Sequence, residues 1–223
     1  MSRKYEYLPL RGISVQNFYL VNIGCLTIVG APLMAPFVLS IRSELKTTAK
    51  YRQRMMRDTG DFLLSTANYV GGHPLLPHSG KCVLGLSTNA LTIYNIERTK
   101  WSLGFSVRQR WEIAPAIAIP LTTIVNTYTG RPKSAQEVYR ADFGTTIDVI
   151  EQSPFLNVVF EEKGKKFQIS FQDFDPWVVS DLRESGGTTE MVLKYWGLGM
   201  WKLQSPQDWH NYVISLKYQT AGE

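Results

Sequence analysis

The chain has 223 residues, of which 44% are hydrophobic and 12% aromatic, which suffices for a core and excludes a disordered chain. Its formal net charge of +5 suits an anionic surface or an acidic partner, but basic residues lack the density typical of nucleic-acid-binding proteins. Cys25 lies in an apolar run and Cys82 in a predicted strand, so we expect no structural disulfide, and the cysteine count favours a reducing compartment.

A long apolar run follows the N-terminal segment 1–18. The stretch from Tyr19 to Ile41 contains no charged residue. It is long enough for the roughly 20 residues that a helix needs to cross a bilayer, so the sequence predicts a transmembrane helix over 19–41. More basic residues follow this run than precede it. The positive-inside rule therefore predicts a protein of the inner (cytoplasmic) membrane, with its N-terminus outside and its main body in the cytoplasm.

Other interpretations of this run stay open. Pro32 and Pro36 interrupt a regular helix, which allows a bent or re-entrant segment, and a soluble or peripheral helix is a further alternative. A cleaved signal peptide is disfavoured because prolines stand where small residues should precede cleavage. Asn22 is polar, and we expect it to face a protein neighbour rather than lipid.

A basic helix is predicted over 42–60. Ser43 is suited to cap its N-terminus and Gly60 to end it. The helix is either a solvated connection or a contact with anionic lipid head groups, to which each basic residue near the surface would contribute about 1 kcal/mol. The candidate lipid-surface residues are Arg42, Lys46, Lys50, Arg52, Arg54 and Arg57.

The residues from 61 to 186 alternate with the period of β-strands. The segment 81–96 predicts a hairpin whose polar turn is Ser87-Thr88-Asn89, with Cys82, Leu84 and Leu86 on one face. Further strands are predicted over 101–107, 117–127, 146–151, 156–161 and 167–171, and Gly164 suits the turn before the last of them. A helix is predicted to begin at Asp175 and to stop at Gly186-Gly187. The fold class is therefore mainly β with flanking helices (α+β).

The motifs "GGHPLLPHSGKCVLGLSTNALTIY", "IAIPLTTIVNT" and "FQISFQDFDPWVVSDL" resemble the PH-like/GRAM-like domains of bacteria. The resemblance covers about Asn68 to Ser185. It implies an antiparallel barrel capped by a helix. Family members that bind phosphoinositides carry basic residues around the first hairpin turn, which has none here, and Lys163, Lys165 and Lys166 offer only a weak patch in a later turn.

The C-terminal tail, 187–223, is rich in aromatic residues. Ser205 and Pro206 open a last helix with Asp208 in its first turn. Trp196, Trp201, Trp209 and Tyr212 are candidates for a protein interface, and the alternative is that they pack onto the barrel core.

No catalytic motif stands out in the chain. His73 and His78 are spaced H-x4-H, but further zinc ligands are missing nearby, so we interpret them as surface histidines of a proline-braced turn. Nucleotide-binding and nucleophile-elbow motifs are absent as well. We therefore expect no catalytic residue, metal or cofactor, and an enzyme of unknown class is the weakest alternative.

Two hypotheses of function follow. The first is a non-catalytic, membrane-anchored accessory or scaffold subunit that stabilises a larger membrane protein complex through its PH-like domain and tail. The second is a PH-like module that senses an anionic lipid surface. Membrane-complex subunits and anionic lipid are the expected partners, and nucleic acid is not.

Overall fold

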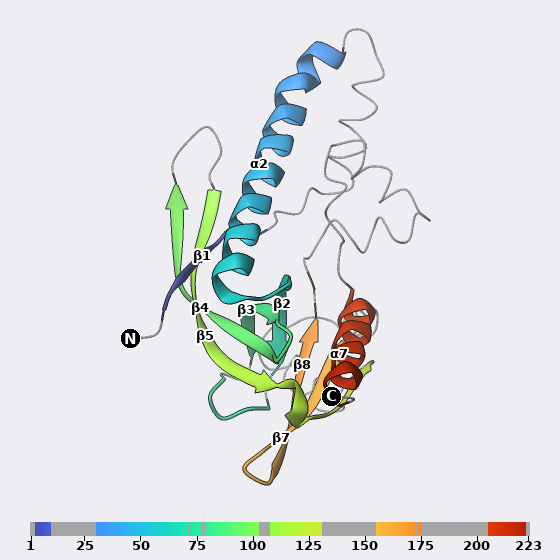
Figure 1. Cartoon of the computed structure of the whole chain (residues 1–223). Coiled ribbons are helices and arrows are strands. Elements are labelled where there is room, and N and C mark those ends of the chain that lie inside the picture. Colours follow the sequence, from blue (N-terminus) through green and yellow to red (C-terminus); the bar gives the residue numbers. More distant parts are fainter. Residues whose placement is uncertain are drawn as a thin grey trace, which may run out of the picture.

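The computed structural model describes residues 3–9, 30–70, 72–76, 79–102, 108–130, 155–172, 174 and 205–221. In this part of the chain an antiparallel sheet of eight strands lies between two helices (Figure 1). The strand order is β1-β5-β4-β3-β2-β8-β7-β6. The mainly β part of the predicted fold class is therefore seen.

The elements have the following bounds: β1 (Tyr5–Tyr7), α2 (Gly30–Thr59), β2 (Leu63–Val70), β3 (Ser79–Leu86), β4 (Ala90–Ser102), β5 (Arg108–Pro120), the 3-10 turn η1 (Leu121–Thr123), β6 (Ile124–Thr129), β7 (Leu156–Glu162), β8 (Lys165–Gln172) and α7 (Pro206–Ala221).

The two hairpins predicted from local turn chemistry are confirmed. β3 and β4 are joined by a turn in which the Ser87 hydroxyl accepts the Ala90 N–H at 3.1 Å. β7 and β8 are joined through Lys163 and Gly164, with φ angles of 51° and 73°. Two successive residues with positive φ match the right-handed twist of the strands they connect. Glycine adopts positive φ without strain, so it is favoured at this position of the turn.

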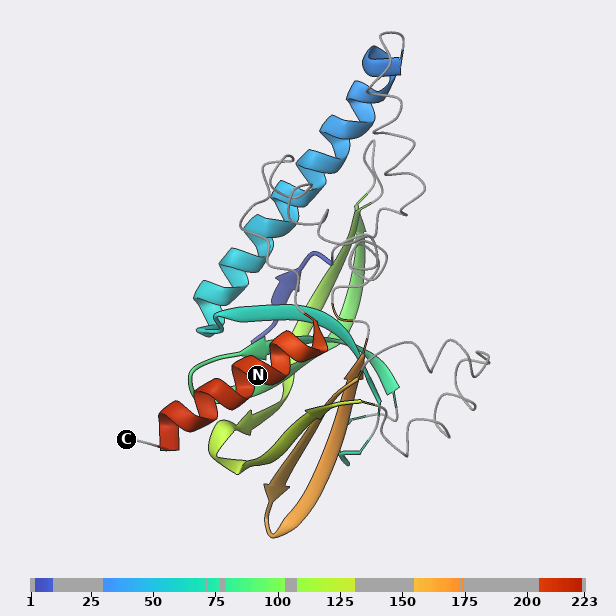
Figure 2. The same cartoon turned by 90° about the vertical axis from the view of Figure 1, so that its right-hand side faces the viewer.

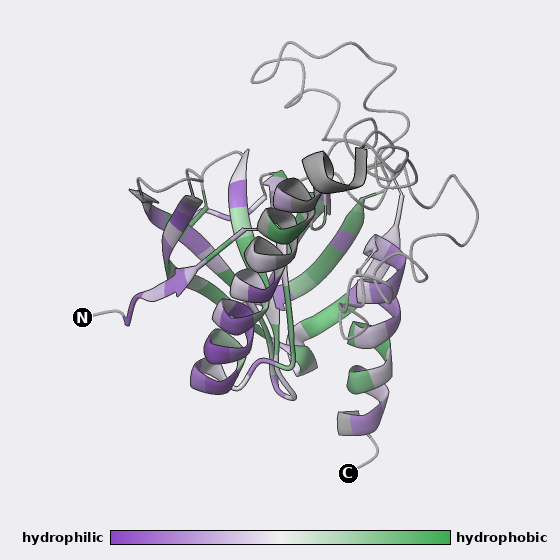
Figure 3. Ribbon diagram, turned by 90° about the horizontal axis from the view of Figure 1, so that it is seen from above, coloured by the Kyte–Doolittle hydropathy of each residue, from purple (hydrophilic) through white to green (hydrophobic). Residues whose placement is uncertain are grey.

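Strand β2 links the two halves of the sheet, because it pairs with β3 along its whole length and with β8 near its end. The main core lies on one face of this sheet, where Cys82, Leu84 and Leu86 are fully buried. Helix α7 closes this core with Trp209 and Val213, both fully buried. The hydrophobic residues of the central strands are green in Figure 3.

A second core lies on the opposite face. Val83 alternates with Cys82 and Leu84, so it points away from the main core and toward α2 and β1. There Met55 of α2, Tyr7 of β1 and Trp111 of β5 form a buried cluster. The sheet is therefore covered by α7 on one face and by α2 on the other.

The predicted transmembrane helix over 19–41 is not seen. Helix α2 begins at Gly30 and continues without a break past Ser43 to Thr59, so the expected span and the expected basic helix share one helix. Among the described residues, no helix is both long enough and apolar enough to cross a membrane. The reason is that the apolar part of α2, Gly30 to Ile41, is shorter than the roughly 20 residues required and leads directly into basic sequence.

The end of α2 agrees with the sequence, whereas its start does not. Gly60 has a φ angle of 79° and donates its N–H to the Met56 carbonyl at 2.9 Å, which is a common helix ending. Ser43 is not an N-cap because the helix runs through it. The predicted strand over 146–151, the helix after Asp175, the earlier part of the predicted span with Asn22, and both Trp196 and Trp201 lie outside the described residues.

Candidate functional site

Helix α2 has two different faces. One stripe packs on the sheet and includes Thr48, Arg52 and Met55, which are buried. On the opposite side a stripe of exposed cations recurs at helical spacings of four, four and three residues; we call it the outer basic face, and it consists of Lys46, Lys50, Arg54 and Arg57. The C-terminal half of α2 is accordingly hydrophilic in Figure 3. The helix thus holds four cations in solvent while its other side is fixed to the body.

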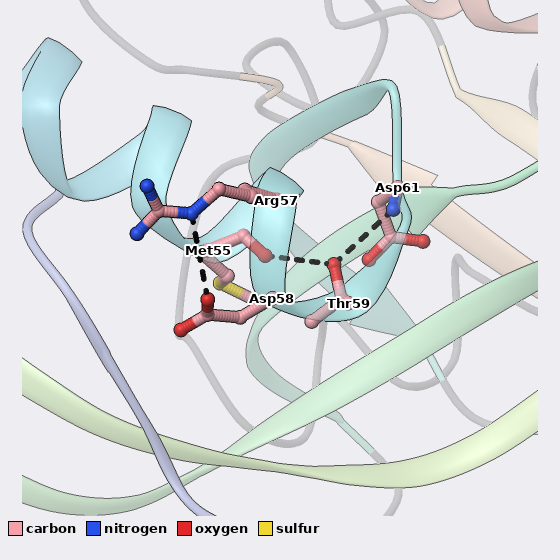
Figure 4. A network of polar contacts seen from close by, with 5 residues as sticks. All are labelled: Met55, Arg57, Asp58, Thr59 and Asp61. Atoms are coloured by element: carbon pink, nitrogen blue, oxygen red, sulfur yellow. Dashed lines mark hydrogen bonds and ion pairs between the residues drawn. The ribbon is translucent and has the colours of Figure 1, made fainter.

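The acids of α2 do not neutralise this stripe. The helix contains two acids, Glu44 and Asp58, and neither falls on the 46, 50, 54, 57 stripe. Asp58 lies 3.8 Å from Arg57, whose side chain is 78% exposed (Figure 4). An exposed pair at this distance contributes little, so the positive charge of the stripe remains available to a partner.

A hydrogen-bonded turn fixes how α2 meets the sheet. The Thr59 hydroxyl donates to the Met55 carbonyl at 3.0 Å and accepts the Asp61 N–H at 3.2 Å (Figure 4). Tyr94 then donates its hydroxyl to the buried Asp61 carboxylate at 2.6 Å. These bonds hold α2 at a set angle on the body, so the outer basic face is presented by a rigid support.

The glycine at position 85 makes room for this contact. A Cβ there would lie 2.6 Å from an Asp61 carboxylate oxygen and 2.8 Å from the Tyr94 ring. Burial, and then the hydrogen bond to Asp61, raise the pKa of Tyr94, so its hydroxyl stays protonated and donates at neutral pH.

The sequence predicted Arg52 as a lipid-surface residue, but its side chain is directed into the body. It is 9% exposed, and its guanidinium donates to the Tyr7 hydroxyl at 2.9 Å and to the Leu64 carbonyl at 2.7 Å. Arg52 therefore joins α2, β1 and β2. The physical reason is helical geometry, because position 52 falls on the stripe of Thr48 and Met55 rather than on that of Lys50 and Arg54. The structure does not describe the side chain of Arg42.

His73 is not the surface histidine that we expected. It is 6% exposed, its Nδ1 accepts the Leu75 N–H at 3.2 Å, and its Nε2 lies 3.0 Å from a Glu162 carboxylate oxygen. Its ring also contacts Phe160 and Phe167. These contacts tie the loop after β2 to the β7–β8 hairpin, which gives His73 a structural role. His78 lies outside the described residues.

The positive charges of the lysines in the β7–β8 hairpin are balanced by nearby glutamates. Lys165 and Lys166 pair across the hairpin with Glu162 and Glu161. Opposite charges at facing positions leave little net field, unlike the stripe on α2. A shallow depression beside this turn also mixes both signs, since Glu161, Lys163 and Lys217 line it.

The described part of the tail belongs to the body. Trp209 is fully buried in the main core, and Tyr212 packs against the same core. The Trp209 side chain is thus a core residue and offers no exposed interface. His210 of the same helix lies 2.8 Å from the Thr127 hydroxyl.

The described residues offer few groups for chemistry. Burial raises the pKa of the fully buried Cys82 thiol, so it is protonated and shielded at neutral pH. Within these ranges, no three His, Cys, Asp or Glu side chains gather as a metal site would require. No protein-family model matches the chain, and no curated protein matches it significantly.

Proposed function

We propose that this protein is a non-catalytic docking module that binds an anionic membrane surface through the outer basic face of α2. The observation that carries the proposal is the exposure of four cations along one side of a helix whose other side is fixed to the sheet. Each basic residue near an anionic leaflet contributes about 1 kcal/mol to binding. The helix backbone that carries the row is already ordered, so binding does not have to order it.

We further propose that the body is a PH-like platform, as the motif resemblance implies. Two features support this: β2 pairs with both β3 and β8, and a helix after the last strand packs on the core. The β3–β4 turn, Ser87 to Asn89, carries no lysine or arginine. The lipid contact that we propose therefore lies on α2 and not at the turn that phosphoinositide-binding members use.

Service as an accessory subunit of a membrane protein complex is a second proposal. It is favoured by two exposed apolar side chains on neighbouring elements, Val125 of β6 and Tyr218 of α7, which are 45% and 73% exposed. This surface differs from the outer basic face. A partner protein held there would leave the cations of α2 free to contact lipid.

A vesicle-binding titration tests the lipid proposal. The triple variant Lys46→Gln, Lys50→Gln, Arg54→Gln should bind anionic vesicles about 100-fold more weakly than the unmodified chain, because three contributions of about 1 kcal/mol are removed. The matched control is Lys163→Gln, Lys165→Gln, Lys166→Gln, which lowers the net charge of +5 by the same three charges. Its binding should change far less.

Two results would oppose the proposal. Equal binding of the unmodified chain to neutral and anionic vesicles would remove any role for lipid charge. An equal loss in the two triple variants would show that general charge, and not the α2 face, determines binding.

A further inference from the structure

The hairpin of β4 and β5 extends beyond the rest of the sheet. β3 pairs with β4 only as far as Asn95, and β1 pairs with β5 only as far as Trp111. Beyond these points the described residues Lys100–Ser102 and Arg108–Arg110 pair only with each other. We call these two segments the outer ribbon. A two-stranded ribbon of this kind buries little surface by itself, so a side chain on it that stays exposed is available for another contact.

The outer ribbon carries an exposed tryptophan. Trp101 is 62% exposed, whereas the other tryptophans of the described residues, Trp111 and Trp209, are 6% and 0% exposed. Tryptophan is highly buried on average in folded proteins. A large aromatic ring held in solvent at the end of a projecting ribbon is therefore available for an intermolecular contact.

The outer ribbon and α2 extend from the body toward the same side. Both views of the fold show this arrangement (Figures 1 and 2). The Arg110 guanidinium lies 5.4 Å from the centre of the Tyr51 ring, which joins the ribbon to the flank of α2. The ribbon therefore lies beside the helix that carries the outer basic face.

The ribbon carries three basic residues, Lys100, Arg108 and Arg110, and no acid. Lys100 is compensated from outside the ribbon, since it lies 3.2 Å from Glu6 and 3.8 Å from Glu112. Trp101 has no charge, so its contribution to binding would be apolar and would add to the electrostatic contribution of the basic residues.

We propose that Trp101 is an interfacial anchor that enters the head-group region of the anionic bilayer when the outer basic face docks. This inference rests on the proposed function. The charge complementarity between the outer basic face and anionic lipid identifies the occupant. The indole ring suits the depth, because tryptophan places an apolar body and a polar N–H at the membrane–water boundary.

The full-length chain provides the test. Trp101→Ala should weaken binding to anionic vesicles by about 10- to 100-fold, the range expected for loss of one large apolar side chain from a buried position. Its salt dependence should be unchanged, because no charge is altered. Trp101→Phe should keep most of the affinity. The matched control is Leu75→Ala, which removes an apolar side chain that is 67% exposed in the loop after β2 and should bind like the unmodified chain.

A second readout follows the ring directly. Brominated lipids should quench the tryptophan fluorescence of the bound chain, and Trp101→Ala should abolish most of that quenching. Unchanged affinity and quenching in Trp101→Ala, together with loss of binding in the α2 triple variant, would overturn the anchor while the proposed function stands. Equal binding of the unmodified chain to neutral and anionic vesicles would overturn both the proposed function and the anchor. If Trp101→Ala left vesicle binding intact and abolished self-association, Trp101 would be a protein contact and the inference would fail.

Discussion

The burial of Trp209 leads to a sharp prediction for Trp209→Ala. The side chain is fully buried in the main core, and its ring centre lies 5.8 Å from that of Phe174. Its Nε1–H donates to the Ser65 hydroxyl at 3.2 Å, and Ser65 is itself fully buried. The substitution therefore removes a large apolar group and also leaves a buried hydroxyl without this donor.

The expected loss is large compared with ordinary stability. Truncation of a buried tryptophan to alanine costs about 3–5 kcal/mol, and a buried polar group left unsatisfied costs about 1–3 kcal/mol more. Since domains are stable by only about 5–15 kcal/mol, Trp209→Ala should remove a large fraction of the free energy of unfolding. Trp209→Phe should lose less, because it keeps an aromatic ring in the core.

Urea unfolding followed by far-ultraviolet circular dichroism measures these effects without relying on tryptophan emission. Tyr218→Ala is the control on the same helix, because its side chain is 73% exposed and its cost should lie within about 0.5 kcal/mol. A Trp209→Ala chain that unfolds at the same urea concentration as the unmodified protein would refute the reasoning. In that case α7 would not contribute to the core.

Two more predictions concern buried polar groups. Arg52→Ala should lower the free energy of unfolding by about 2–3 kcal/mol, because it removes the donors to Tyr7 and Leu64, whereas Lys50→Ala on the exposed stripe should change it by less than about 0.5 kcal/mol; similar urea midpoints for both would contradict the burial of Arg52. Burial raises the pKa of Tyr69 from 10.0 to about 12, so its contribution to stability is complete below pH 10 and lost as the pH rises through about 12. Tyr69→Phe should flatten the pH dependence of unfolding in that window, and an unchanged alkaline profile would count against the raised pKa.

Local signals in the sequence were enough for several elements. The turn at Ser87 to Asn89 and the turn at Gly164 depend on residues that are adjacent in the chain, and both hairpins are confirmed. The last helix likewise begins at Pro206, where Ser205 and Asp208 hydrogen-bond to each other. Turn and capping chemistry depends on neighbouring residues, so sequence patterns predict it well.

Burial that depends on distant partners was not predicted. Arg52 is held by Tyr7, 45 residues away, and His73 by Glu162, 89 residues away. Without the fold, Arg52 was grouped with the other basic residues of the helix as a candidate for the lipid surface. One signal was present, because Thr48, Arg52 and Met55 share a helical stripe that excludes Lys46, Lys50 and Arg54. Sorting the basic residues by this periodicity would have separated Arg52 from the others.

The start of α2 shows a different limit. Hydropathy identified an apolar run from Tyr19 to Ile41, but hydropathy does not state where a helix begins. In the structure the helix begins at Gly30 and crosses the boundary between apolar and basic sequence. The change in composition at Arg42 was taken as the end of an element, although the backbone continues through it.

A fluorophore placed on the outer basic face tests the central claim most directly. Gln53 is exposed on α2 beside Arg54, and Gln219 is exposed on α7. In a Cys25→Ser background, where Cys82 is fully buried, Gln53→Cys and Gln219→Cys each provide one accessible thiol in the described part of the chain for an environment-sensitive label. Anionic vesicles should shift the emission of the label at 53 to the blue and leave the label at 219 unchanged. An unchanged signal at 53 in the presence of bound vesicles, or equal shifts at both positions, would contradict docking through this face.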